Sequence, residues 1–357
     1  MSVASRYLNR ELLSVFGIVL LVLLLVAVGG RFIGYLQDAA VGRYNASSLF
    51  TLLGLRLPEI ATLLLPFALF LAVLLTLGRF YAEQEMAVLL GGGAGPIRLL
   101  LWLSPVILLI ALLVGWLSLY VTPSSNAQLA EQLVAERQDR DFANLAPGVF
   151  HVYARGDRVS YADAVSDDDE HLLEVFLGER QGGLASVTVR AERGSQFVDD
   201  KTGSRFLLLE QGARFEGQIG QRDYRVVAFE RMGQRIEVDV ASATRQELTA
   251  LPSATLQTLR TPEALAELGW RQSLPLLTLL TATLALGLAR VKPRQGRFAR
   301  MLPGLGVFLL YYLGLTLVQN QMLEGGWPSA LGYWPVHGLF ALLAFYWLTR
   351  VGHPQRT

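Results

Sequence analysis

A chain of 357 residues that is 52% hydrophobic and only 17% charged is too apolar to consist of two or three ordinary soluble domains. The formal net charge of +1 does not represent the charge of any one surface of the protein. Most charged residues lie between residues 131 and 271, while apolar residues gather at both ends. The absence of cysteine excludes disulfide bonds and thiolate metal sites, and the four histidines lack the spacing of metal ligands.

Six stretches without formal charge are long enough to cross a hydrocarbon core, which takes about 20 helical residues. We therefore predict an α-helical polytopic membrane protein with six transmembrane helices. The first stretch could instead be a signal peptide, but its apolar run exceeds the usual core of about 7–15 residues, which favours a retained helix. The predicted spans are Leu12 to Gly30, Ile60 to Gly78, Leu99 to Val121, Gln272 to Ala289, Met301 to Leu323, and Leu331 to Thr349.

The distribution of Lys and Arg in the short connections predicts the orientation, since these residues resist translocation. Eleven of them fall on one side of the membrane, and only Arg31, Arg43 and Arg56 fall in the short loops of the other. We therefore expect both termini in the cytoplasm and the middle of the chain outside it. The eleven are Arg6, Arg10, Arg79, Arg98, Arg290, Lys292, Arg294, Arg297, Arg300, Arg350 and Arg356.

The middle of the chain changes from helical to strand periodicity. Ser124 to Arg140 has helical spacing and predicts a short amphipathic stalk. From Pro147 onward apolar residues alternate between turn signals, which predicts an all-β sandwich or jelly roll. A helical pattern then leads to Trp270 and Arg271, an aromatic and a cation suited to the membrane interface. The predicted strands are Val149 to Tyr153, Arg158 to Tyr161, Leu172 to Glu179, Ser186 to Arg190, Arg205 to Leu209, Ala213 to Glu216 and Tyr224 to Phe229.

The sequence lacks the motifs of enzymes that energise transport or cleave membrane substrates. Neither Lys201 nor Lys292, the only lysines, follows a phosphate-cradling glycine run, so we predict a non-catalytic chain that does not hydrolyse ATP. No G-x-S-x-G or H-E-x-x-H motif occurs, and no span carries a pair of carboxylates suited to a protease or proton relay. Glu59, at the start of the second span, is an interfacial cap or a relay residue.

The cytoplasmic loop between the second and third spans predicts a short amphipathic helix. Arg79 to Leu90 combines charged and apolar residues, and the glycines of Gly91 to Gly95 end the helix before Pro96. The segment is too short to span the membrane and too apolar for a simple turn. It either inserts into a groove of a soluble partner or rests in the lipid as a re-entrant helix.

Arg31 closes the first span at its outer edge. A cation in this place serves as a snorkelling anchor in many membrane proteins. A guanidinium is also well suited to grip a lipid phosphate with two hydrogen bonds. Both interpretations remain open on the residues alone.

Several segments, taken together, resemble one family: the inner-membrane permeases of the lipopolysaccharide export machinery (LptF/LptG), and within it the LptF branch. They occur in the family's order from residue 6 to about residue 300. No single segment is decisive, but jointly they are highly specific. They are Arg6-Tyr7-Leu8 with Arg10-Glu11, Leu52 to Leu55 with Pro58-Glu59, Leu65-Pro66 through Thr76-Leu77-Gly78, Glu83 to Gly93, Gln211-Gly212 with Arg214 to Gly217, Arg222 to Arg225, Ala266-Glu267-Leu268 with Trp270-Arg271, and Pro293 to Arg297.

The resemblance implies an inserted periplasmic β-jelly roll at residues 122–271, between helices 1–3 (residues 1–121, with a cytoplasmic coupling helix at about 80–92) and helices 4–6 (residues 272–357). Two related permeases, here this chain and an LptG-type partner, would form a cavity that opens to the outer leaflet of the bacterial inner membrane. A soluble ATPase dimer would bind the ATP, so this chain needs no cofactor. Further implied partners are lipopolysaccharide, a single-span periplasmic bridge protein and a jelly-roll bridge, but no nucleic acid.

The resemblance also favours docking of the ATPase on the cytoplasmic helix. By position, Glu85 resembles the family's coupling carboxylate. Glu83, Met86, Leu89 and Leu90 complete the predicted ATPase-coupling surface.

For lipopolysaccharide binding the resemblance implies a set of basic residues and one aromatic residue. Arg31 falls where family members carry a basic residue that faces the lipid A phosphates, and Arg43 and Arg56 are the further predicted cations. Phe150 resembles a position that lines the jelly-roll interior near the membrane, although an ordinary core aromatic fits equally well.

Two other functions and one departure from the family accompany this interpretation. A membrane-anchored periplasmic sensor would need a cytoplasmic output domain, which the chain lacks. A lipoprotein-sorting permease would carry its large domain after the first span, whereas here it follows the third. The segment from Asn320 to Leu331 contains no Lys or Arg, although some relatives place basic contacts beside the fifth span.

Overall fold

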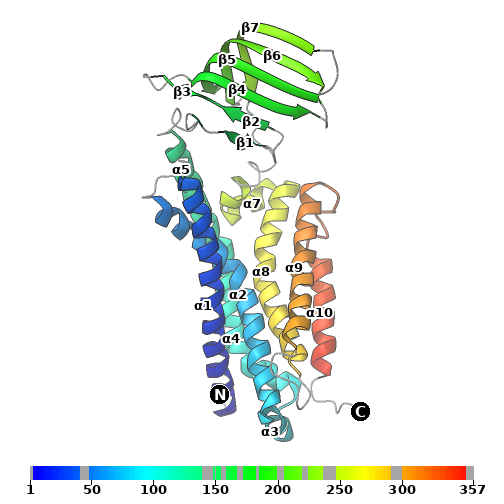
Figure 1. The fold of residues 1–357 in the computed structure, drawn as a ribbon. Coiled ribbons are helices and arrows are strands. Elements are labelled where there is room, and N and C mark those ends of the chain that lie inside the picture. The colour runs from blue at the N-terminus through cyan, green and yellow to red at the C-terminus, as the bar shows by residue number, and fades with distance from the viewer. Residues whose placement is uncertain are drawn as a thin grey trace. The chain divides into compact units, whose positions relative to one another are not determined.

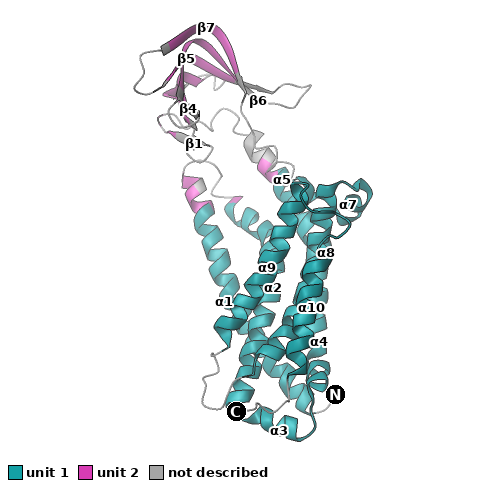
Figure 2. Ribbon diagram, turned by 90° about the vertical axis from the view of Figure 1, so that its right-hand side faces the viewer, with its two compact units in different colours: residues 1–34, 49–131, 245–357 teal, residues 35–48, 132–244 magenta. Residues whose placement is uncertain are grey.

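The computed structural model of the protein divides into two compact units (Figure 2), a helical unit and a β unit. The helical unit is made of residues 1–34, 49–131 and 245–357, and the β unit of residues 35–48 and 132–244. The structure describes residues 3–40, 48–138, 148, 150–153, 158–166, 172–181, 185–198, 205–218, 224–235, 247–290 and 300–350.

The helices run roughly side by side (Figure 1). Helices α4 and α5 join without a break through the π-helical segment η2, so the predicted stalk continues the third span instead of starting separately. The helices are α1 (Val3–Ala40), α2 (Leu49–Ala82), α3 (Glu85–Gly91), α4 (Pro96–Trp116), η2 (Leu117–Val121), α5 (Thr122–Gln138), α7 (Ser253–Leu259), α8 (Pro262–Leu288), α9 (Met301–Leu323) and α10 (Trp334–Thr349).

Each of the six predicted spans is helical over most of its length, and the fifth has the predicted bounds, Met301–Leu323. Among the described residues, four helical stretches are long and apolar enough to cross a membrane: Val3–Gln37, Leu49–Ala82, Pro96–Leu133 and Met301–Leu323. The sixth prediction corresponds to α10, which is apolar but has only 16 residues. The fourth lies in α8, whose first part is charged. A multi-span helical protein is therefore confirmed, while the count of six stays a prediction.

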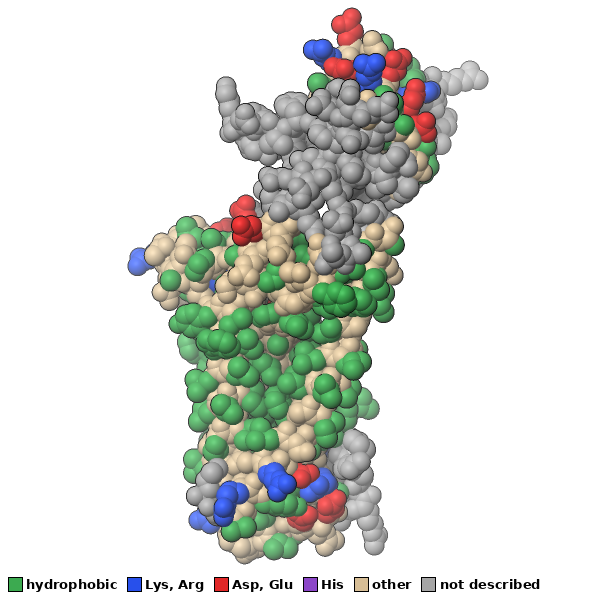
Figure 3. Space-filling model, turned by 90° about the vertical axis from the view of Figure 1, so that its left-hand side faces the viewer, with side chains coloured by type: hydrophobic (Ala, Val, Ile, Leu, Met, Phe, Trp, Pro, Cys, Tyr) green, Lys and Arg blue, Asp and Glu red, His purple; other side chains and the backbone are tan. Residues whose placement is uncertain are grey.

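The helical unit is built around α2. In the most apolar 18-residue stretch of α2, 67% of the residues are buried, whereas in the corresponding stretch of α1 only 6% are buried. Phe70 of α2 packs on Phe308 of α9, and a Cβ on Gly304 would lie 2.6 Å from Leu74, so α9 approaches α2 too closely for a larger residue there. On the face shown in Figure 3, hydrophobic side chains cover the length of this unit, and Lys, Arg, Asp and Glu gather at the end that holds α3.

A buried polar chain joins the last three helices. Because Ser273 of α8 donates its hydroxyl hydrogen to the carbonyl of Gly269 (2.7 Å), it accepts a hydrogen bond from Nε2 of His337 in α10 (2.9 Å). Nδ1 of His337 then accepts from the hydroxyl of Tyr311 in α9 (2.6 Å). Every member has a partner, which is the condition under which polar groups stabilise an apolar interior.

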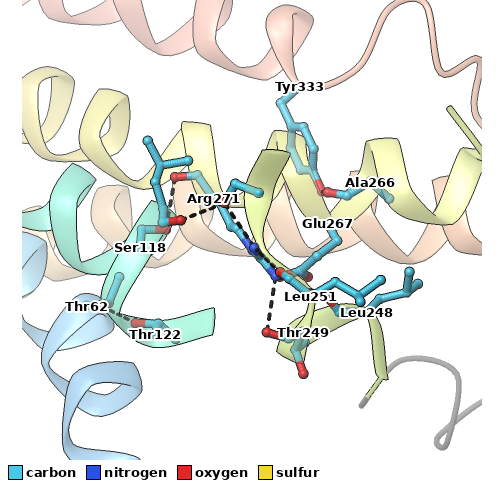
Figure 4. Close-up of polar contacts among 12 residues, drawn as sticks. Thr62, Ser118, Thr122, Leu248, Thr249, Leu251, Ala266, Glu267, Arg271 and Tyr333 are labelled. Carbon is cyan, nitrogen blue, oxygen red and sulfur yellow. Dashed lines mark hydrogen bonds and ion pairs between the residues drawn. The ribbon is translucent and has the colours of Figure 1, made fainter. Parts of the chain in front are cut away.

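Arg271 of α8 binds residues 248–253, the segment that begins the last part of the helical unit (Figure 4). Its side chain is only 3% exposed, so it is not the interfacial cation that the sequence predicts. Nε donates to Glu267 (2.8 Å), Nη1 to Leu251 O (2.9 Å) and Ser253 Oγ (3.0 Å), and Nη2 to Leu248 O (3.0 Å) and Thr249 O (3.1 Å). The five N–H donors of the guanidinium thus have five acceptors.

The same cluster continues to the π-helical segment. Ser118 of η2 donates to the carbonyl of Arg271 (3.0 Å), and Ser253 donates to the carbonyl of Leu119 (2.7 Å). The extra residue of a π turn frees carbonyls from the regular helical ladder, and hydroxyl donors can then satisfy them. The end of the third span and the start of α8 are therefore fastened to each other.

The β unit is a seven-stranded antiparallel sheet in the order β1-β2-β4-β5-β6-β7, with β3 paired to β4 (Figure 1). An antiparallel all-β unit is confirmed, while the jelly roll stays a prediction. The strands are β1 (His151–Tyr153), β2 (Arg158–Tyr161), β3 (Ala164–Val165), β4 (Leu172–Gln181), β5 (Ala185–Val198), β6 (Arg205–Gln218) and β7 (Tyr224–Arg235). Its buried side chains are Ala162, Leu172, Val175, Val187, Val189, Ala191, Leu207 and Leu209.

The sheet has a line of irregular positions across its four long strands. The strand register omits Glu174, Glu192, Gln211 and Glu230, which lie opposite one another on β4, β5, β6 and β7. Glu174 and Gln211 have positive φ angles of 50° and 52°. The two strands predicted at Arg205 to Leu209 and Ala213 to Glu216 are therefore one strand, β6, in which Gln211 interrupts the alternation of apolar residues.

We predict that Arg271→Lys lowers the thermal stability of the purified protein, as measured by fluorescence-detected unfolding in detergent. Lysine has three donors, so two of the five buried acceptors lose their partner, at a cost of about 1–3 kcal/mol each. The matched control is Arg260→Lys, since Arg260 is exposed. Equal melting temperatures for the two variants would contradict this account of Arg271.

Candidate functional site

The predicted cytoplasmic helix is broken in two in the structure. Helix α2 ends at Ala82, Gln84 adopts a left-handed conformation (φ 63°), and α3 begins at Glu85. The left-handed residue turns the chain, so Glu83 and Glu85 lie on either side of a sharp corner instead of on one continuous helix.

Helix α3 is attached to the helical unit by its apolar residues. Met86 is 1% exposed, and Leu89 and Leu90 pack partly buried against the same core. Glu83 and Val88 face outward, and Glu85 is half-buried. Met86 therefore fixes α3 in place, and the acidic residues and Val88 are the part of α3 that a partner can reach.

The glycine-rich end of α3 matches the predicted helix stop. Gly93 has a φ angle of 80°, and the amides of Gly93 and Ala94 return to the carbonyls of Leu90 and Leu89 at 3.0 Å. This pattern satisfies the last carbonyls of a short helix. Nη1 of Arg98 adds a hydrogen bond to the carbonyl of Gly93 (3.1 Å). The corner and this cap together give α3 a defined position.

Arg79 connects this corner to α1. Its Nη1 donates to Oε1 of Glu11 (2.7 Å), its Nη2 donates to the hydroxyl of Tyr7 (3.3 Å), and its Nε lies 3.6 Å from Oε2 of Glu83. Sequence reasoning used Arg79 only for orientation, because Glu11 lies 68 residues away and no local pattern signals the pair.

Helix α1 is held to the rest of the unit at its first turns. Leu8 and Leu12 are fully buried, and Nδ2 of Asn9 donates to the carbonyl of Trp102 in α4 (2.7 Å). Farther along, Leu21 and Leu25 are exposed. Most of the predicted first span thus presents its surface to lipid or to another protein.

The predicted lipopolysaccharide-binding cations differ in their surroundings. Arg31 is exposed on α1, and the described residues include no acidic partner for it. Arg56 of α2 pairs with Glu59 at 2.6 Å, so this carboxylate is the partner of a cation. The rings of Phe32 and Phe50 lie 5.9 Å apart, which brings α1 and α2 together near both cations. Arg43 lies outside the described residues.

Phe150 is not a core residue. Its side chain is 62% exposed, and its ring lies 4.7 Å from that of Tyr161. The hydroxyl of Tyr161 donates to Asp163 (3.0 Å), and this hydrogen bond raises the pKa of Tyr161. The structure therefore leaves the ring of Phe150 available for contact with an apolar ligand.

Comparison with known proteins identifies the family. The family described as "Lipopolysaccharide export system permease LptF/LptG" matches residues 6–350. Among curated relatives, the "Lipopolysaccharide export system permease protein LptF" of Escherichia coli K12 is 30% identical over 340 residues, which cover 95% of this chain and 92% of the relative. The LptF protein of Shigella flexneri gives the same values. The chain therefore belongs to the LptF/LptG family of lipopolysaccharide export system permeases.

Proposed function

We propose that this chain is the LptF-type permease subunit of the lipopolysaccharide export ABC transporter of the bacterial inner membrane. The observation that carries the proposal is the family match across residues 6–350. Together with an LptG-type permease, the chain forms a cavity that takes lipopolysaccharide from the outer leaflet and passes it to a periplasmic bridge. Neither a sensor nor a lipoprotein-sorting permease accounts for that match.

The topology of six spans with cytoplasmic termini forms part of the proposal. The predicted cytoplasmic cations come from separate connections, and several of them meet in the structure. Nη1 of Arg290 donates to the carbonyl of Arg350 (3.0 Å), and Nε of Arg300 donates to the carbonyl of Arg290 (3.1 Å). These contacts support a single cytoplasmic end of the helical unit, as the positive-inside rule requires.

The acyl chains of the substrate set the physical problem. Each buried methylene is worth about 0.8 kcal/mol, so transferring several acyl chains into water would cost tens of kcal/mol. The chains must pass from the membrane cavity to another apolar surface. In the β unit, Phe150, Phe215 and Val226 are exposed apolar side chains that suit this purpose.

The energy source lies in a partner. We propose that a soluble ATPase dimer binds ATP and docks on α3, with Glu85 and Glu83 as its charged contacts and Leu89 and Leu90 as apolar support. The exposed Val88 suits the same groove. The chain itself then needs no cofactor, and its role is to convert movement of α3 into movement of the spans.

We predict that Glu85→Ala weakens binding of the ATPase by about tenfold, because a charged hydrogen bond contributes about 1.5–3 kcal/mol. Binding is measured by titrating the ATPase onto the purified permease complex. Glu131→Ala, at an exposed acid of α5, is the control and should bind normally. Unchanged binding of the Glu85 variant would remove Glu85 from the docking surface.

We predict that Arg31→Gln lowers the amount of lipopolysaccharide that co-purifies with the complex more than Arg56→Gln does. The guanidinium of Arg56 already has Glu59 as a partner, whereas Arg31 is exposed and has no acidic partner in the part of the chain that the structure describes. Bound lipid is measured by mass spectrometry, with Arg260→Gln as the control. If the Arg31 and Arg260 variants retained equal amounts of lipopolysaccharide, Arg31 would be a snorkelling anchor for α1 and not a ligand of the lipid.

We predict that a photo-crosslinking residue at position 150 traps lipopolysaccharide only when ATP can be hydrolysed. The same photo-crosslinking residue in place of Glu192, an exposed residue on the irregular line of the sheet, should trap much less lipopolysaccharide. Crosslinking is measured in reconstituted vesicles by immunoblotting. Crosslinks at position 150 that form without ATP would place Phe150 off the transport path.

A further inference from the structure

We propose that Arg79 couples the ATPase-docking corner at Glu83 to α1, the helix that carries Arg31. This inference rests on the proposed function, because it assumes that the ATPase docks on α3. Arg79 acts as a positioning residue: it does not contact the lipid, but it sets the position of a helix that does.

The contacts of Arg79 are of two kinds. Toward α1 the contacts are made: Glu11 accepts from Nη1 at 2.7 Å, and Tyr7 accepts from Nη2 at 3.3 Å. Toward the corner the contact is incomplete: Oε2 of Glu83 is 3.6 Å from Nε, and among the described residues this buried Nε has no hydrogen-bond acceptor. A small approach of Glu83 would therefore complete a charge-assisted hydrogen bond.

Of the two carboxylates beside Arg79, Glu83 is the more exposed, and it is the one that a docking partner would have to reach. The side chain of Glu83 is 53% exposed and open to a partner, whereas that of Glu11 is 26% exposed. A docking protein that moves Glu83 changes the electrostatic field at Arg79, and with it the strength of the pair with Glu11. Since an unmade hydrogen bond to a buried donor is costly, the arrangement responds to small displacements.

Because α1 is long, a small tilt near Glu11 would become a larger displacement at Arg31. The buried residues Leu8 and Leu12 hold the helix at the level of Glu11, and little of its most apolar window is buried. At about 1.5 Å per residue, Arg31 lies about 30 Å along the helix from Glu11. A tilt of about 10° at the foot would therefore move Arg31 by about 5 Å.

The main test measures lipopolysaccharide released per ATP hydrolysed by the complex purified through a tag on this chain and reconstituted in vesicles. We expect Arg79→Gln to lower this ratio by about fivefold, the lower end of ordinary coupling between sites. The charge exchange Glu11→Arg with Arg79→Glu should leave the ratio low, because it keeps an ion pair with α1 but turns the contact with Glu83 into a repulsion. Arg6→Gln, at an exposed cation near the start of α1, should leave the ratio unchanged.

A second measurement follows α1 directly and uses the absence of native cysteine. Spin labels at Val26→Cys in α1 and Leu342→Cys in α10, both exposed, report the distance between these helices with and without nucleotide. We expect a nucleotide-dependent change that Glu11→Gln abolishes. This variant keeps Arg79, so it still tests the coupling if Arg79→Gln fails to assemble.

Either of two results would overturn the inference: a normal release ratio for Arg79→Gln, or a nucleotide-dependent movement of α1 that persists in Glu11→Gln. The outcome is distinguishable from failure of the proposed function. If Glu85→Ala weakens ATPase binding but Arg79→Gln keeps the ratio, docking stands and coupling through Arg79 is wrong. If Glu85→Ala binds the ATPase normally, the docking assignment itself is wrong.

Discussion

The guanidinium of Arg271 is the interaction on which the helical unit depends most. It makes five hydrogen bonds to residues 248–253, which end at the first residue of α7, and to Glu267, and the carbonyl of Arg271 accepts a hydrogen bond from the hydroxyl of Ser118. An arginine in an apolar interior is costly unless all its donors are paired, so the surrounding carbonyls are positioned for it and for no smaller cation. The hydroxyls of Ser118 and Ser253 connect this cluster to the end of the third span, and so join two halves whose sequence is interrupted by more than a hundred residues.

Around this fixed part, the helices differ in how firmly they are held. The polar chain through Ser273, His337 and Tyr311 joins α8, α9 and α10, and 67% of the most apolar 18-residue window of α2 is buried. Helix α1 is the exception: Leu8, Asn9 and Leu12 anchor its first turns, whereas beyond them its residues are partly buried or exposed and its ring contact is Phe32 on Phe50 of α2. The sideways opening proposed above needs one firm body and one helix that is held less firmly, and this distribution of contacts suits that proposal.

The spans were predictable from sequence because hydropathy and length act locally. Met301–Leu323 matches its prediction residue for residue, and the antiparallel strands follow from alternation. What failed depends on backbone angles or on distant partners. The left-handed Gln84 divides the predicted cytoplasmic helix, the left-handed Gln211 hides the continuity of β6, and the burial of Arg271 follows from carbonyls about 20 residues away. The pair of Arg79 and Glu11 joins segments with no shared local pattern, so only the fold reveals it.

The irregular line across the sheet has a mechanical consequence. Strand pairing resists bending across a sheet, and the register is interrupted at Glu174, Glu192, Gln211 and Glu230 in the same place on four successive strands. We therefore expect the sheet to bend more easily along this line than on either side of it. The four side chains on the line are polar or charged and exposed, so bending there would expose little additional apolar area.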